Sequence, residues 1–167
     1  SIQFQPNSKI LTFPNCFLAF SMIESIDIPP SIIDIKEGCF ESTPKLFKFT
    51  IDPKNKYFTS YKNDFILTKS TQESDEFDVL FFARRNIERA IIPSFIKRIT
   101  PFAFMNCTIL DYVEIPSNSK LQIIGKYSFS YSSIQSISIP SHLIEICEGS
   151  FSDCYNFTKI EFQQNSE

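Results

Sequence analysis

Apolar residues recur along this chain in one repeated pattern. Several segments read apolar-x-x-apolar-x-apolar, and a proline usually follows close behind. Alternation over the last three positions is the period of a β-strand with its apolar side chains on one side. Proline has no N–H to donate to a neighbouring strand, so the strand ends there. We therefore predict short strands at the ends of segments 23–28, 46–51, 110–115, 134–139 and 157–162.

These segments belong to longer repeats. The stretch IPSFIKRITPFAF at 92–104 shares its apolar skeleton with IPSHLIEICEGSF at 139–151. Prolines at 6, 29, 53, 93, 116 and 140 lie 23, 24, 40, 23 and 24 residues apart. Self-similarity at such a period indicates a repeat protein.

A phenylalanine lies at a fixed offset inside the connections between strands. It comes eleven residues after the proline in four repeats and is displaced by an insertion in a fifth. A sandwich or barrel with evenly spaced strands would also explain the strand pattern, but it needs no such column. The column favours a repeat solenoid with an internal spine of rings, formed by Phe17, Phe40, Phe104, Phe129 and Phe151.

Each repeat is expected to pass once around a flattened coil and to add a strand to a parallel sheet, about 4.8 Å from the previous one. In the 40-residue interval, the runs DFILTK and DVLFFAR flank the charged segment STQESDE. This arrangement predicts a β-hairpin inserted at 65–84 that projects from the end or side of the coil. We predict one domain, 1–167, cut from a longer array, with repeats at about 1–28, 29–52, 53–92, 93–115, 116–139 and 140–167.

The repeats carry a known signature. LDYVEIPSN at 110–118 and FTKIEFQQN at 157–165 match L-x-x-L-x-L-x-x-N. The longer pattern at 92–116, with I-P, I-x-x-I, Phe, Cys and L-x-x-I-x-I-P, resembles the BspA-like class of leucine-rich repeats, and the resemblance covers practically the whole chain. Ser31 and His142 replace the signature asparagine in two repeats, so no continuous asparagine ladder is expected.

This resemblance implies a right-handed coil. It further implies a parallel sheet on the concave face, and loops, 3-10 turns or one-turn helices on the other face. It implies a cell-surface or secreted adhesin that binds host or other-cell proteins. The inserted hairpin also resembles an irregular repeat of this family.

Charge and hydropathy exclude some partners. A formal net charge of −3 leaves no basic stripe of the kind that nucleic acid requires. No apolar run is long enough to span a membrane, so no membrane insertion by this segment is expected.

The five cysteines do not form a disulfide pattern. Their number is odd, and Cys16 and Cys39 share one offset from a proline while Cys107 and Cys154 share another. Small buried thiols in repeat columns are favoured over disulfides. With one histidine and no C-x-x-C, zinc is not expected, and we predict no metal or cofactor.

Candidate catalytic groups are scarce. His142 alone could serve as a base at neutral pH, and no phosphate-binding or nucleophile motif is present. The acidic cluster Glu73, Asp75, Glu76 and Asp78 is interpreted as a solvated hairpin turn. We therefore predict that the chain is not an enzyme.

The strand residues that point away from the core are the candidate binding surface. Tyr112 and Arg89 are residue types that anchor interfaces, although an ordinary mixed-charge surface would look similar. The predicted partner-binding positions are Ser25, Asp27, Lys48, Thr50, Arg89, Ile91, Tyr112, Glu114, Ser136, Ser138, Lys159 and Glu161.

The sequence is compatible with two cellular locations. The sequons at Asn106 and Asn156, at equivalent turns of two repeats, would be N-glycosylation sites in a secreted protein. Unpaired cysteines favour instead an intracellular scaffold that assembles other proteins, such as cytoskeletal ones. In either location the expected partner is a protein.

Overall fold

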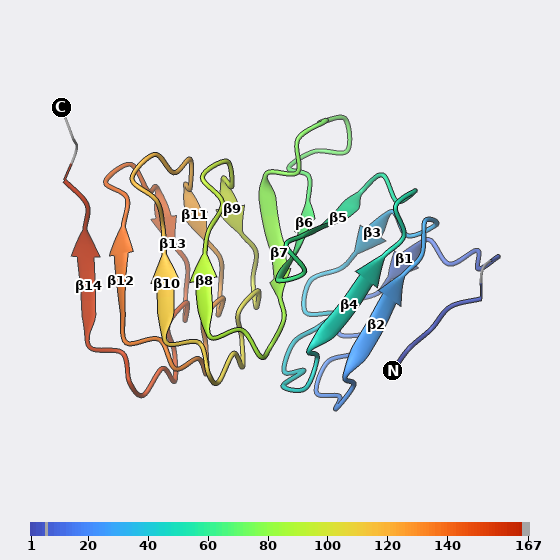
Figure 1. Cartoon of the computed structure of the whole chain (residues 1–167), viewed down its shortest axis with the longest axis horizontal. Coiled ribbons are helices and arrows are strands. Elements are labelled where there is room, and N and C mark those ends of the chain that lie inside the picture. Colours follow the sequence, from blue (N-terminus) through green and yellow to red (C-terminus); the bar gives the residue numbers. More distant parts are fainter. Residues whose placement is uncertain (6, 165–167) are drawn as a thin grey trace.

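The chain forms an all-β solenoid. This computed structural model describes residues 1–5 and 7–164, and none of these residues belongs to a helix. The coils stack along one long axis, with the two termini at opposite ends (Figure 1). The strands are β1 (Thr12–Phe13), β2 (Ser25–Ile28), β3 (Asp34–Ile35), β4 (Lys48–Ile51), β5 (Phe58–Tyr61), β6 (Phe65–Thr68), β7 (Val79–Ala83), β8 (Arg89–Ile91), β9 (Arg98–Ile99), β10 (Tyr112–Glu114), β11 (Ile123–Ile124), β12 (Ser136–Ile139), β13 (Glu145–Ile146) and β14 (Lys159–Phe162).

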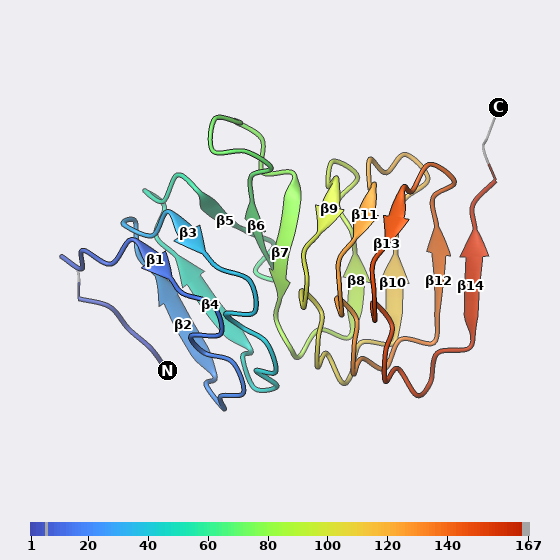
Figure 2. The same ribbon diagram turned by 180° about the vertical axis from the view of Figure 1, so that it is seen from behind.

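The strands build two walls. The front wall, nearest the viewer in Figure 1, contains the parallel pairs β2–β4, β8–β10 and β12–β14. The back wall, seen in Figure 2, contains the parallel pair β1–β3 and the parallel series β7–β9–β11–β13. The five strands predicted from the apolar pattern all lie in the front wall. The short back-wall strands β3, β9, β11 and β13 were not predicted, and each contains an isoleucine of the connection between two predicted strands.

Consecutive β-turns join the back wall to the front wall. Met105 N–H donates to the Phe102 carbonyl within its own coil, and Asn106 N–H donates to the Ser130 carbonyl of the next coil. The predicted 3-10 or one-turn helices are wrong here, because two residues of each turn segment have a positive φ and right-handed helices require a negative one. These residues are Cys16 and Phe20, Gly38 and Ser42, Phe102 and Asn106, Tyr127 and Tyr131, and Gly149 and Asp153.

A stack of phenylalanine rings runs through the C-terminal coils. Phe104 and Phe129 stack with ring centroids 4.7 Å apart, Phe129 and Phe151 at 5.4 Å, and Phe151 and Phe157 at 4.7 Å. Burying the Phe104 and Phe129 rings contributes on the order of 1.5–3 kcal/mol each. The Phe151 and Phe157 rings are half-buried. Farther toward the N-terminus, Phe40 contacts two strand phenylalanines edge to face instead of extending the stack.

The spine prediction is wrong at Phe17, which is 46% exposed. Leu18 takes the buried position in this coil. Its N–H donates to the Cys39 carbonyl, and Cys39 immediately precedes Phe40. In the same way, Phe104 N–H donates to the carbonyl of Ser128, which immediately precedes Phe129. The offset of eleven residues from a proline therefore does not hold in the first coil.

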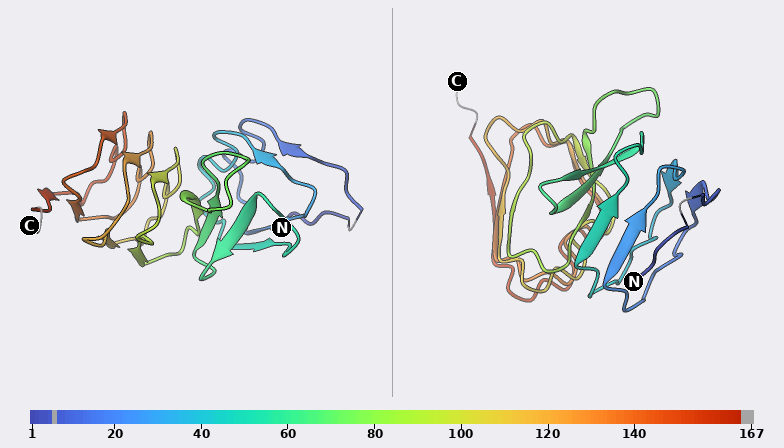
Figure 3. Two further views of the ribbon diagram at one scale, coloured as in Figure 1. Left: turned by 90° about the horizontal axis from the view of Figure 1, so that it is seen from above. Right: turned by 45° about the vertical axis from the view of Figure 1, so that its right-hand side comes forward.

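The inserted segment is part of the solenoid. Strands β6 and β7 pair antiparallel as the hairpin prediction requires, but β5 also pairs with β6, and β7 joins the back wall through β9. On β6, Phe65 and Leu67 pack into the C-terminal core cluster while Ile66 packs into the N-terminal one. The three strands therefore form a partition between two cores, and only the loop 69–78 projects (Figures 1 and 3). The prediction that the whole hairpin projects is wrong.

A buried arginine joins the coils on either side of this partition. Arg85 is 1% exposed, and its guanidinium lies 4.3 Å from the centre of the Phe82 ring. Its Nη1 donates to the Ala103 carbonyl at 2.8 Å, and its Nη2 donates to the Phe40 and Phe102 carbonyls at 3.2 Å. Burial lowers the pKa of Arg85. Across residues 1–5 and 7–164 no carboxylate pairs with it, so main-chain carbonyls supply its solvation.

The cysteines are all free, and three are buried. Cys39, Cys107 and Cys154 fit the prediction of small buried thiols, whereas Cys16 is exposed and Cys147 is partly exposed. Cys154 Sγ donates to the Phe129 carbonyl at 3.0 Å, and burial raises the pKa of Cys39 to about 12. Burial also raises the pKa of Cys107, so Cys39 and Cys107 have little thiolate character. All three buried thiols pack into the core clusters.

Candidate partner-binding face

The front wall presents the predicted binding positions to solvent. On β2, β4, β8, β10 and β12 they alternate with buried or half-buried residues, so the coil fixes which side chains face outward. On β14 all four residues are exposed, so Lys159 and Glu161 do not alternate with buried neighbours. The paired strands also align them across the wall. In register are Ser25 with Lys48, Asp27 with Thr50, Arg89 with Tyr112, Ile91 with Glu114, Ser136 with Lys159, and Ser138 with Glu161.

Four of these residues form a preorganised patch on β8 and β10. The Arg89 guanidinium lies 4.3 Å from the centre of the Tyr112 ring, and Tyr112 Oη lies 3.5 Å from a carboxylate oxygen of Glu114. Ile91 is 55% exposed and Tyr112 is 40% exposed. The cation–π contact holds two long side chains in place before any partner arrives, which lowers the entropy that binding would cost.

The rest of the front wall is polar and of mixed charge. Asp27 accepts a hydrogen bond from Thr50, and Lys159 pairs with Glu161 on the last strand. Neither β4 and β8 nor β10 and β12 pair, so the face consists of three two-stranded panels, and β2 and β4 are tilted relative to the strands from β8 onward (Figure 1). Ile91 and Tyr112 lie on the middle panel, β8–β10.

The two sequons occupy different places in their coils. Asn106 N–H donates to the Ser130 carbonyl, and Tyr131 N–H donates to the Ser152 carbonyl of the next coil. Asn106, Tyr131 and Asp153 therefore occupy the same position in three successive coils. Asn156 lies three residues beyond that position, so the prediction of equivalent turns is wrong. The side chain of Asn106 is partly buried with an unbonded Oδ1, whereas Asn156 is exposed. Of the two, Asn156 offers the more accessible amide.

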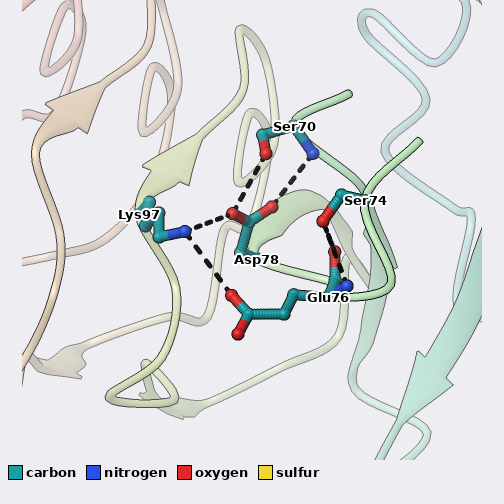
Figure 4. A network of polar contacts seen from close by, with 5 residues as sticks. All are labelled: Ser70, Ser74, Glu76, Asp78 and Lys97. Carbon is teal, nitrogen blue, oxygen red and sulfur yellow. Dashed lines mark hydrogen bonds and ion pairs between the residues drawn. The ribbon is translucent and has the colours of Figure 1, made fainter. Parts of the chain in front are cut away.

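The acidic cluster is not wholly solvated. Asp78 is 1% exposed and receives hydrogen bonds from Ser70 N at 2.9 Å, Ser70 Oγ at 3.1 Å and Lys97 Nζ at 2.9 Å (Figure 4). Burial raises the pKa of Asp78, but the hydrogen bonds from Lys97 and Ser70 lower it by more, so the pKa lies below its usual value. Asp78 thus closes the base of the projecting loop, while Glu73, Asp75 and Glu76 are exposed.

The described residues form no metal centre. His142 is exposed, and residues 1–5 and 7–164 hold no group of three or more His, Cys, Asp or Glu side chains placed to bind a metal ion. The same residues include no helix that could cross a membrane. The outward side chains of the front wall are the candidate binding surface.

Comparison with known proteins identifies the repeat. The BspA type leucine rich repeat region matches residues 1–65 and 76–167 in six copies. The chain belongs to this family. The ten unmatched residues, 66–75, lie within the partition and its loop, so this leucine-rich repeat protein departs from the family pattern where its back wall is interrupted.

Solved structures share the fold. A leucine-rich repeat protein from Eubacterium ventriosum is 19% identical, with a TM-score of 0.74 over 91% of this chain and 39% of its own. The pneumococcal vaccine antigen PcpA is 14% identical (TM-score 0.74, 98% and 45%), and a leucine-rich cell surface protein from Faecalibacterium prausnitzii is 18% identical (TM-score 0.58, 94% and 52%). This chain therefore spans about two fifths to one half of these structures. A search of curated proteins found no match.

Proposed function

We propose that this leucine-rich repeat chain is a non-enzymatic protein-binding module at the cell surface or in secreted form, where it mediates adhesion to host or other-cell proteins through its front wall. The observation that carries the proposal is the patch on β8 and β10, where Arg89 is held against Tyr112 beside the exposed Ile91. Arginine and tyrosine are common energetic anchors of protein interfaces. Rigid strands with variable outward residues suit such recognition.

The names of two structural relatives support the location. One is described as a cell surface protein and another as a vaccine antigen. If the chain is secreted, Asn156 is the sequon that would carry a glycan, because its side chain is exposed. Asn106 would be modified less efficiently.

An intracellular scaffold is the second candidate function. All five cysteines are free, and persistent free thiols are commoner in reducing compartments. In that setting the same front wall would hold cytoplasmic proteins, including cytoskeletal ones.

Protease treatment of intact source cells separates the two locations. Peptides of this chain released by trypsin before lysis, with glycosylated Asn156 among them, are the expected result for a surface module. Protection until lysis, with both sequons bare, would favour the intracellular scaffold. A cytoplasmic enzyme measured in the same supernatant controls for leakage.

Two substitutions test the binding face. The chain is coupled to fluorescent beads and its affinity for purified fibronectin, laminin and collagen is measured. We expect Arg89→Ala and Tyr112→Ala each to lower the affinity for a matrix protein that binds by at least about tenfold, because each removes a preorganised anchor. Lys120→Ala, at an exposed position off the front wall, is the matched control. Unchanged affinity in both front-wall variants would show that another surface binds, and failure of the unmodified chain to bind any of the three would contradict matrix adhesion.

A further inference from the structure

In the regular part of the back wall, each coil covers the strand edge of the one before it. Gln122 N–H donates to the Lys97 carbonyl at 2.8 Å, and Gly125 N–H donates to the Ile99 carbonyl at 2.9 Å. The next coil repeats the pattern between β11 and β13, where the Ile144 and Cys147 N–H groups donate to the Gln122 and Ile124 carbonyls. The approach is close: a Cβ on Gly125 would lie 2.6 Å from the Ile99 carbonyl oxygen.

This ladder stops at β3. Ile33 and Lys36 N–H groups donate to the Leu11 and Phe13 carbonyls, both at 2.9 Å, which fixes β3 in the same register as the other back-wall strands. Because Phe13 accepts from Lys36, the N–H and C=O of its partner Ile35 point to the opposite edge of β3. The next back-wall strand, β7, pairs with β6 instead of β3. In the described chain no backbone N–H donates to the Ile35 carbonyl.

A groove lies along this open edge. Its volume is about 520 Å³, within the range of ligand-binding clefts. Asp34 and Ile35 of β3, with the preceding Ile33, form one side, and residues of β7, β9 and β11 form the other. Residues of β5 and β6 also line it. The loop segment 69–72, held at its base by Asp78, forms a lip over it. Figure 2 shows β3 standing apart from the regular series β7, β9, β11 and β13.

The charged side chains that line the groove are mostly cationic. They are Lys69, Lys97 and Arg98 against the single carboxylate of Asp34, which is already paired with Lys36. Lys97 is neutralised by the buried Asp78. Lys69 and Arg98 form no ion pair with any carboxylate in the described part of the chain. The groove therefore combines an unused strand edge with two uncompensated positive charges.

We propose that this groove binds an extended acidic peptide segment of a partner protein. The peptide backbone pairs with the open edge of β3, and its carboxylates face Arg98 and Lys69. Strand addition obtains its affinity from main-chain hydrogen bonds and its specificity from side-chain contacts. Here the open edge of β3 supplies the main-chain groups, and Lys69 and Arg98 supply the charges that would select acidic residues. This site is on the wall opposite the Arg89–Tyr112 patch and is independent of the proposed adhesive function.

Binding of a synthetic peptide tests the proposal. The probe is a fluorescein-labelled heptapeptide of alternating valine and glutamate, and its affinity for the full chain is measured by fluorescence polarisation. Hydrogen exchange of the Ile35 amide is followed by NMR. We expect saturable binding with at least about tenfold slower exchange at Ile35, and at least about tenfold weaker binding by Arg98→Glu. Lys45→Glu, a charge reversal at an exposed position outside the groove, should bind as the unmodified chain does.

Two matched peptides separate the components of the site. A heptapeptide with lysine in place of glutamate should bind at least about tenfold more weakly if charge selects the ligand. A glutamate peptide N-methylated at alternate residues should also bind weakly, because it cannot pair as a strand. Equal binding of the methylated peptide, or unchanged exchange at Ile35 when the acidic peptide is bound, would overturn strand addition at β3. Equal binding by Arg98→Glu would overturn the charge assignment.

Discussion

At the residue scale, Arg85 is the most unusual group in the molecule. A buried charge is normally compensated by an opposite charge, but this guanidinium is bound by three main-chain carbonyls and the face of Phe82. The carbonyls come from coils on both sides of the partition. Arg85 therefore supplies hydrogen-bond donors at a place where the regular backbone ladder is missing.

Removing this side chain should destabilise the protein strongly. Arg85→Met keeps an apolar stem but removes the charge-assisted hydrogen bonds to the Phe40, Phe102 and Ala103 carbonyls, each of which keeps one neutral donor. The free energy of unfolding should therefore fall by about 2 kcal/mol or more. Urea denaturation measures the change. The neighbouring Arg84→Met is the control: Arg84 pairs with Asp64 at 2.7 Å near the surface, so its loss should cost less than about 1 kcal/mol. Equal effects of the two substitutions would contradict the role assigned to Arg85.

Some buried residues could be predicted from the sequence and others could not. The alternation of isoleucines located the front-wall core, because the strand period is fixed by backbone geometry. The counting rule failed at Phe17, where Leu18 is buried instead. Asn55 was overlooked because it lies one residue past the expected asparagine position, yet its side chain bonds the carbonyls of Pro29 and Ile32 and the N–H groups of Tyr57 and Phe58. Such polar roles depend on coils that meet only after folding.

At the element scale, the partition had a sequence signal. The segments FILT and VLFFA lack the alternation of a strand with one exposed face, and near-continuous apolar runs are typical of strands buried on both faces. The hairpin itself was predicted correctly from β-propensity and the charged turn. Its position inside the solenoid follows from the pairing of β7 with β9, which joins residues far apart in sequence.

The projecting loop should respond to acid through Asp78. Its folded pKa lies below the ordinary value of about 3.9. Its contribution to stability is therefore complete above that value and is lost as pH falls through the folded pKa. Near neutral pH, Asp78→Asn should lower the free energy of unfolding by about 2 kcal/mol, because it removes charge-assisted hydrogen bonds.

A pH series tests this assignment. The difference between Asp78→Asn and the unmodified chain in urea denaturation should shrink steadily as the pH is lowered from about 5 to about 2. Asp75→Asn alters an exposed carboxylate of the same loop and should have little effect at any pH. A difference that stays constant with pH would show that Asp78 acts through packing alone.

At the scale of the whole molecule, the partition divides the apolar core into two clusters. The C-terminal cluster extends through the Phe104–Phe129 stack, and the N-terminal cluster includes Phe13 and Phe40. In repeat proteins, stability is approximately a sum of local and nearest-neighbour terms. The sequence predicts the repeat and hence a stability that is roughly additive over the coils. It does not predict the division of the core, because that depends on β6 contributing side chains to both clusters.

Reciprocal core substitutions should reveal two units. Ile26→Ala and Ile137→Ala each truncate a side chain that is at most 2% exposed, and each should cost about 2–5 kcal/mol locally. Hydrogen exchange followed by mass spectrometry should show faster exchange mainly before the partition for Ile26→Ala and mainly after it for Ile137→Ala. Uniform acceleration along the chain in both variants would indicate one cooperative unit.

The interrupted ladder also has a mechanical consequence. Hydrogen bonds of both walls run along the long axis, so tension between the two ends would peel successive coils apart. At the partition neither β3–β7 nor β4–β8 carries a ladder, and the load there falls on Arg85, the Phe82 contacts and the chain itself. This junction is where the stretched molecule would yield first. Under tension the chain would therefore extend in steps, and its back-wall groove would widen before either array of coils unravels.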